Sequence, residues 1–182
     1  MKSLRQLGNQ PVSLPLLADD VLETHAARIL LLLKICGTKG EIDGLTKLAK
    51  LDFFVRYPQF FAKVAKHLNK PLAVPSETTE SVMVRHHYGP WDKRYYQVLP
   101  YLEARGLIQV RQQGNAYVFC LRDDGKRAAE ELQKKSEFRT MTDQMKLVKG
   151  LVGRKSGTAL KELVYEVFDA EVAQKQLGEV IQ

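Results

Sequence analysis

LIQVRQQGNAYVFCLR, residues 107–122, has the pattern of a β-hairpin. Two runs of alternating apolar and polar residues flank Gly114-Asn115, a pair that favours a tight two-residue turn. The register set by this turn separates apolar from polar side chains, so turn chemistry and periodicity agree. The predicted cross-strand pairs are Ile108 with Leu121, Val110 with Phe119 and Gln112 with Tyr117 on one face, and Arg111 with Val118 and Gln109 with Cys120 on the other.

Helical spacing of apolar residues predicts most of the remaining elements. Pro90 suits the first turn of the helix before the hairpin, where a missing N–H costs nothing. Trp91 and Tyr95 begin the apolar face of that helix, and Gly106 provides a left-handed cap at its end. The predicted helices cover 25–36, 45–57, 59–68, 91–105, 123–135 and 139–152, with a last one that begins at Ser156 or Thr158 and a short strand at 81–88.

Length and composition indicate a globular protein with one main core. The chain has 182 residues, of which 45% are hydrophobic and 27% charged; these values are ordinary for soluble domains. No apolar run is long enough to span a membrane, and the first twenty residues lack a secretory signal and read as an arm. Cys36 and Cys120 are far apart in sequence, which favours two buried thiols in a reducing cytoplasm over a disulfide.

Positive charge is concentrated in one part of the chain. The formal net charge is +7, and residues 34–70 hold eight basic and three acidic residues. A basic segment of this kind favours an anionic partner, and nucleic acid is the commonest. A solvated lysine-rich helix surface explains the same charge equally well.

Three helices followed by a hairpin form the order of a winged helix-turn-helix fold. The junction YLEARGLIQV (101–110) resembles the connection from recognition helix to wing in many winged-helix proteins. This predicts a mainly α fold with a β-hairpin wing (α+β), an inserted helix and additional C-terminal helices. The expected organisation is an N-terminal arm at 1–23, a winged-helix domain at 24–135 with an insertion at 58–85, and a helical extension at 136–182.

Three further segments resemble a narrower family, the small middle subunit of ABC-three-component, Lamassu-like bacterial defence systems. The segments are DGLTKLAKLDFFVRYP (43–58), VRHHYGPWDKRYY (84–96) and GRKSGTALKELVYEVF (153–168). The resemblance implies a non-catalytic, cytoplasmic winged-helix subunit. Such a subunit would bridge or regulate an SMC-type ATPase and an effector in anti-phage or anti-plasmid defence. The alternative is a free-standing winged-helix DNA-binding transcription regulator.

The sequence motifs do not support a catalytic, cofactor-binding or metal-binding site. His86 and His87 are adjacent in a predicted strand, so their side chains would point to opposite faces. GRKSGT (153–158) lacks the glycine that precedes the lysine of a phosphate-binding P-loop, and Ser156 or Thr158 as a helix N-cap explains it better. We therefore predict no enzymatic activity, no cofactor, no metal and no small-molecule substrate.

The first binding hypothesis is an auxiliary contact with double-stranded DNA. Basic side chains on the recognition helix, the wing and the helix packed against them would mainly meet phosphates, which gives salt-dependent and non-specific affinity. Solvated charges on a protein-interaction domain are the competing interpretation. The candidate DNA-binding residues are Lys47, Lys50, Arg85, Lys93, Arg94 and Arg111.

The second hypothesis is docking to a partner protein. The predicted recognition helix carries more aromatic residues than a groove-reading helix needs, and aromatic residues and arginine commonly anchor protein interfaces. Trp91 and Tyr95 could instead face the protein's own core, whereas Tyr96 lies off the apolar stripe and is expected to be exposed. The candidate interface residues are Trp91, Tyr96, Tyr101, Arg154 and Lys155.

Overall fold

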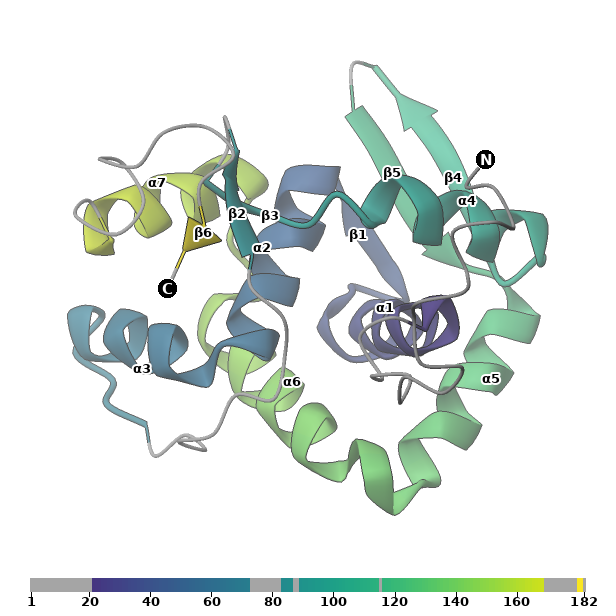
Figure 1. The fold of residues 1–182 in the computed structure, drawn as a ribbon, viewed down its shortest axis with the longest axis horizontal. Coiled ribbons are helices and arrows are strands. Elements are labelled where there is room, and N and C mark those ends of the chain that lie inside the picture. Colours follow the sequence, from purple (N-terminus) through teal and green to yellow (C-terminus); the bar gives the residue numbers. More distant parts are fainter. Residues whose placement is uncertain (1–20, 73–82, 87–88, 115, 169–179, 182) are drawn as a thin grey trace, which may run out of the picture.

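The computed structural model describes residues 21–72, 83–86, 89–114, 116–168 and 180–181. The fold is mainly helical with a small three-stranded antiparallel sheet (Figure 1). The predicted arm at 1–23 lies almost wholly outside the described residues. The helices are α1 (Leu22–Cys36), α2 (Leu45–Arg56), α3 (Pro58–His67), α4 (Tyr95–Ala104), α5 (Asp123–Lys134), α6 (Arg139–Val152) and α7 (Gly157–Val167), with a 3-10 turn, η3 (Ser136–Phe138).

The predicted hairpin is confirmed in both extent and register. Strands β4 (Ile108–Gln113) and β5 (Ala116–Leu121) pair antiparallel in all five predicted positions. Gly106 and Gly114 both have positive φ, near 70° and 60°, a backbone conformation that glycine adopts without steric cost. The hairpin projects beyond the helices (Figure 1).

A short strand that the sequence analysis missed completes the main sheet. None of the predicted helices or strands covers residues 37–44, yet β1 (Glu41–Asp43) pairs with β5 and gives the strand order β1-β5-β4. Ile42 is buried there. A second small sheet has the order β3-β2-β6, from β2 (Met83–His86), β3 (Gly89–Trp91) and β6 (Val180–Ile181).

Helix α1 occupies the centre of the core (Figure 1). Its long aliphatic run is buried almost all round, which is typical of a helix that is apolar on all sides. Helices α2, α4, α5 and α6 contact it, and α7 packs on α2 and α3. Apolar residues from α1 through to α7 therefore share one hydrophobic core.

Close packing of α5 against the start of the hairpin predicts a sharp difference between two glycines. A Cβ at Gly125 would collide with the backbone carbonyl of Leu107, whereas a Cβ at Gly150 in α6 would meet no neighbouring atom of the described residues within 4 Å. We expect Gly125→Ala to lower the free energy of unfolding by about 1–3 kcal/mol. As the matched control, Gly150→Ala should raise it by about 0.5–1 kcal/mol. Urea unfolding of both variants measures this, and equal effects would contradict it.

Candidate interaction site at the start of helix α4

The segment before α4 differs from the predicted helix start. Trp91 is the last residue of β3 and pairs with Val84 of β2, and α4 begins at Tyr95. The prediction of a helix from residue 91, with Pro90 in its first turn, is therefore wrong. Pro90 and Trp91 instead complete a short strand, and the buried Trp91 ring packs edge-on against Tyr95.

Asp92 holds the turn that leads into α4. Its carboxylate accepts hydrogen bonds from the backbone N–H of Arg94 (2.9 Å), from the Arg94 guanidinium (2.8–3.0 Å) and from Arg56 Nη1 (2.7 Å). Arg94 Nη1 also lies 2.9 Å from His25 Nε2 on α1. Paired charges with fixed hydrogen bonds thus tie the start of α4 to α1 and α2.

A second carboxylate, Asp52, extends this network into the core. Asp52 Oδ1 accepts from Arg28 Nε at 2.8 Å, and Oδ2 accepts from the Tyr95 hydroxyl at 2.7 Å. Arg56 Nη1 lies 3.9 Å from the same Oδ2. The buried-charge network, defined as His25, Arg28, Asp52, Arg56, Asp92, Arg94 and Tyr95, joins three helices through groups that are mostly buried.

The pKa values in this network follow from burial and from its charges. Burial raises the pKa of Asp92, but the Arg94 hydrogen bonds and the positive charges of Arg56 and Arg94 outweigh that effect and lower it from 3.8 to about 2. Burial, reinforced by the neighbouring Asp52 charge, holds the pKa of Tyr95 well above its ordinary value. Asp92 is therefore ionised and the Tyr95 phenol neutral at physiological pH.

The structure overturns one of the predicted DNA contacts outright. Lys50 is 0% exposed, and its Nζ lies 6.0 Å from the centroid of the Trp91 ring. Helix α7 packs against α2, and its Lys161 is near enough to Lys50 to interact with it electrostatically, so the prediction that Lys50 meets DNA phosphates is wrong. Arg94 is 28% exposed on its side chain, and contact with a phosphate would compete with its bonds to Asp92 and His25.

The other predicted DNA-binding residues are more exposed than Lys50, apart from Arg85, whose side chain the structure does not describe. Lys93 is exposed in the turn just before α4, and Lys47 is half-buried in the first turn of α2. Arg111 is exposed on β4 and forms an ion pair with Glu41 of β1 at 2.7 Å. Arg85 belongs to β2, but the structure does not describe its side chain. Lys93 and Arg111 are thus the exposed basic residues that the structure leaves from this set.

Among the predicted interface residues, Tyr96 is exposed as expected and Trp91 is not. Tyr96 is 59% exposed, whereas Trp91 is 3% exposed. The proposed interface role of Trp91 is therefore wrong, and the competing core assignment of Trp91 and Tyr95 is confirmed. Tyr101 is half-buried against the core, with the Arg105 guanidinium 5.7 Å from its ring centroid.

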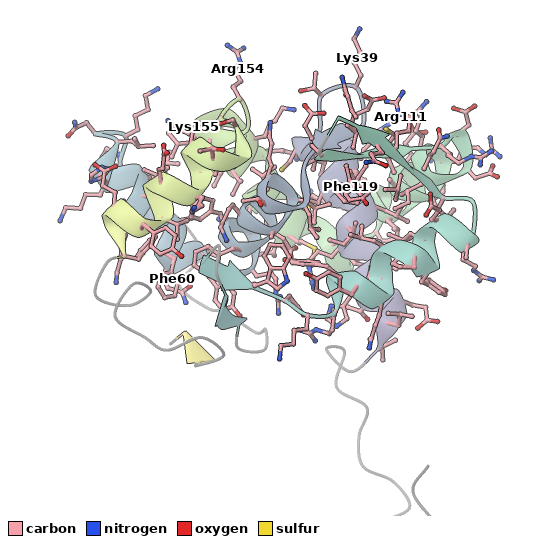
Figure 2. All side chains as sticks on the ribbon, turned by 90° about the horizontal axis from the view of Figure 1, so that it is seen from above. Lys39, Phe60, Arg111, Phe119, Arg154 and Lys155 are labelled. Atoms are coloured by element: carbon pink, nitrogen blue, oxygen red, sulfur yellow. The ribbon has the colours of Figure 1, made fainter. Side chains whose placement is uncertain are left out.

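Arg154 and Lys155 lie in the connection between α6 and α7. Arg154 is exposed and Lys155 half-buried, and Figure 2 places both on the same side of the molecule as Lys39 and Arg111. The Ser156 hydroxyl accepts a hydrogen bond from the backbone N–H of Ala159 at 3.1 Å, so the predicted N-cap of the last helix is confirmed. This cap explains the serine of the GRKSGT segment without a phosphate-binding role.

Sequence reasoning missed Tyr117 as a surface residue. Tyr117 is 54% exposed, and it and Tyr96 are the only large hydrophobic residues that are exposed in the described part of the chain. Tyr117 lies on the same sheet face as Phe119, but nearer the hairpin tip and beyond the buried core. The position of this tyrosine, two residues after the Gly-Asn turn, could have indicated its exposure, because the tip of a hairpin projects from the rest of the protein.

Histidines, cysteines and acids do not gather into a metal-binding group within the described ranges. His25 belongs to the buried-charge network, and His67 pairs with Glu166 of α7 at 3.0 Å. The pair His86 and His87 has no described side chains. Cys36 and Cys120 are both buried and free, as predicted, and burial raises the pKa of the Cys36 thiol to about 12.

Comparison of the chain with protein-family models, curated proteins and solved structures found no match. In the part of the chain that the structure describes, none of the helices combines the length and apolar character that a membrane crossing requires. Functional interpretation therefore depends on the residues and geometry of this chain.

Proposed function

We propose that the chain is a non-catalytic winged-helix subunit that docks on a partner protein through α4 and the β4–β5 wing. The strand order β1-β5-β4 supports the winged-helix assignment, because β1 follows α1 and pairs with the second wing strand. Helix α4 leads through Gly106 directly into β4. The inserted segment with α3 separates α2 from α4, where a tight turn is usual.

The observation that carries the docking proposal is the position of the exposed tyrosines. Tyr96 lies in the first turn of α4 and Tyr117 on the wing strand β5. Exposed tyrosines supply large contact area at low entropic cost and are frequent interface anchors. Because Lys50 is buried and Arg111 is paired with Glu41, phosphate contact is the weaker use of this surface.

The partner class follows from the sequence resemblance. A Lamassu-like middle subunit would hold an SMC-type ATPase and its effector together in defence against phage or plasmid DNA. Lys93 and Arg111 would add a non-specific contact with double-stranded DNA. The buried-charge network fixes the orientation of α4, so that Tyr96 and Lys93 are presented in one defined position.

Tyrosine truncation tests the docking surface. Affinity purification of the tagged full chain from its host should recover an SMC-type ATPase. In a binding titration with that ATPase, the double variant Tyr96→Ala/Tyr117→Ala should bind at least about tenfold more weakly. The control Gln97→Ala/Gln109→Ala changes an exposed residue of α4 and an exposed residue of β4, the strand paired with β5, and should bind like the wild type. Unchanged binding of the tyrosine variant would refute this docking surface.

A titration with duplex DNA at low and high salt separates the two function classes. The proposed subunit should bind weakly, without sequence preference, and lose affinity as the salt concentration rises. Tight binding to one DNA sequence, with no ATPase recovered, would replace the proposal with the transcription regulator.

A further inference from the structure

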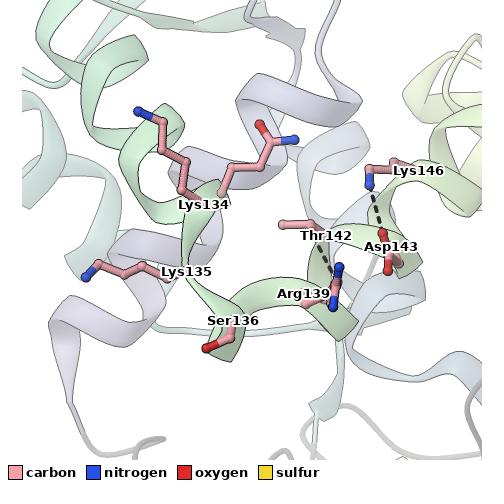
Figure 3. Close-up of a pocket in the computed structure, with 8 residues that line it drawn as sticks. Lys134, Lys135, Ser136, Arg139, Thr142, Asp143 and Lys146 are labelled. Atoms are coloured by element: carbon pink, nitrogen blue, oxygen red, sulfur yellow. Dashed lines mark hydrogen bonds and ion pairs between the residues drawn. The ribbon is translucent and has the colours of Figure 1, made fainter.

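A basic pocket lies where α5 turns through η3 into α6, in a part of the molecule that the proposed docking surface does not use. It has a volume of about 340 Å³ and is open to solvent. Figure 3 shows its lining residues coming from the end of α5, from η3 and from the first half of α6. In Figure 1 this bend lies at the opposite end of the molecule from the hairpin tip. The lining residues are Gln133, Lys134, Lys135, Ser136, Arg139, Thr142, Asp143 and Lys146.

Positive charge dominates the lining of this basic pocket. Four of the eight lining residues are cationic and one, Asp143, is acidic. Asp143 is bound to Lys146 at 2.7 Å, and Lys134 is bound to Glu131, outside the lining, at 2.7 Å. Neither Lys135 nor Arg139 has an ion-pair partner among the described residues. Two cations at the pocket are therefore held by no direct salt bridge, although Glu137 interacts electrostatically with Lys135 and Asp143 with Arg139.

Arg139 and the start of α6 are the features of the pocket best suited to an anion. Arg139 carries a planar guanidinium that can donate two parallel hydrogen bonds to phosphate oxygens. Both hydroxyls of the lining already donate hydrogen bonds, Ser136 to the Glu137 carboxylate at 3.2 Å and the buried Thr142 to the Arg139 carbonyl at 2.9 Å. Helix α6 begins at Arg139, so the positive end of its dipole adds to the same potential.

The kind of anion follows from charge and from the side chains that the pocket lacks. Several cations around one small volume favour a multiply charged group over a carboxylate, which carries a single charge. Among the described residues no aromatic side chain lines the pocket, so these residues offer no surface on which a nucleobase could stack. The lining therefore fits a phosphate group itself and not the base of a nucleotide.

We propose that this basic pocket binds a phosphate group. The exposed pairs Lys134–Glu131 and Lys146–Asp143 contribute little to stability, so both lysines can turn toward the phosphate. Lys135 and Arg139 supply charges that no direct ion pair among the described residues holds in place. The phosphate could belong to a free ion or to the backbone of a nucleic acid.

Isothermal titration calorimetry with inorganic pyrophosphate tests the pocket. The full chain should bind pyrophosphate, and Lys135→Gln/Arg139→Gln should bind at least about tenfold more weakly, since each charge-assisted hydrogen bond contributes substantially. The matched control is Lys126→Gln/Arg127→Gln, which removes two exposed cations of α5 outside the pocket. The control should bind pyrophosphate like the wild type. Thermal melting should show that both variants remain folded.

A parallel titration with a short DNA duplex distinguishes the sources of the phosphate. If pyrophosphate does not bind but the pocket variant alone loses DNA affinity, the ligand is a nucleic-acid phosphate and the pocket assignment holds. If neither pyrophosphate nor DNA distinguishes the pocket variant from its control, the proposal is overturned. Because the tyrosines of the docking surface are intact in all these variants, either result leaves the proposed function to its own test.

Discussion

Replacing Asp52 by alanine is expected to lower the free energy of unfolding by about 3–5 kcal/mol. The side chain of Asp52 is fully buried and accepts hydrogen bonds from Arg28 and Tyr95. Its removal leaves the buried Arg28 guanidinium without this carboxylate and the Tyr95 hydroxyl without this acceptor. Removing one member of a buried ion pair is far more costly than removing both, because the remaining charge stays desolvated.

Two comparisons isolate the cause of the Asp52 effect. Glu130→Gln breaks the exposed ion pair with Lys34 and should change stability by less than about 1 kcal/mol. The double variant Arg28→Met/Asp52→Leu removes both buried charges and should lose less than the sum of the two single variants. Urea unfolding at neutral pH measures all of these variants. A loss below about 1 kcal/mol for Asp52→Ala would show that the buried network does not stabilise the fold.

The Asp52 variant also connects stability to the proposed docking surface. Tyr95, held by Asp52, precedes Tyr96, and Asp92 fixes the turn just before both residues. Loosening this network should shift the start of α4 and weaken binding of the partner even where the variant remains folded. At temperatures where Asp52→Ala is fully folded, its affinity for the proposed ATPase partner should fall although no exposed residue has changed.

The hairpin was predictable because its information is local. Gly114-Asn115 fixes the turn, and the alternation on either side fixes the faces, so no distant residue is needed. Strand β1 was not predictable in this way. Its three residues follow Gly40 without a periodic pattern, and they form a strand because β5 offers a free edge with which to pair.

The start of α4 and the buried charges were not predicted correctly, for a different reason. Trp91 and Tyr95 have helical spacing, but pairing with β2 takes Trp91 into a strand. Arg28 within an otherwise apolar helix was the available sign of a buried charge, because an unpaired arginine is seldom buried. Its partner Asp52 lies 24 residues away on α2, and sequence periodicity does not show which helices will meet.

Lys50 was assigned to a solvent-facing surface because α2 shows one apolar stripe, through Leu48 and Leu51. In the structure every residue of α2 from Leu48 to Arg56 is buried, because α1, α3, α6, α7 and β3 all pack against this helix. A helix covered on several sides buries its polar positions as well. One of them is a lysine whose pKa falls from 10.5 to about 7, mainly through burial and also through the nearby charge of Lys161.

Replacing Lys50 by methionine should therefore stabilise the protein at pH 6 by about 2–4 kcal/mol. Below pH 7 the wild type keeps a proton on a desolvated amine, and the difference between about 7 and 10.5 sets a penalty of up to about 5 kcal/mol. Methionine has a similar length, carries no charge and can keep the apolar contacts of the lysine stem. The expected increase in stability is smaller than the full desolvation cost, because the substitution also removes the interactions of the ammonium group.

The pH dependence gives this prediction its sign. Between about pH 7 and pH 10.5 the unfolded chain holds a proton on Lys50 that the folded protein has released, so wild-type stability should rise with pH across this window. In Lys50→Met this rise should be smaller, and the two proteins should converge toward pH 10. Lys66→Met, which changes an exposed lysine on α3, should follow the wild-type curve within about 0.5 kcal/mol. If Lys50→Met is less stable than the wild type at pH 6 and has the same pH profile, the buried ammonium contributes more through its contacts than its desolvation costs.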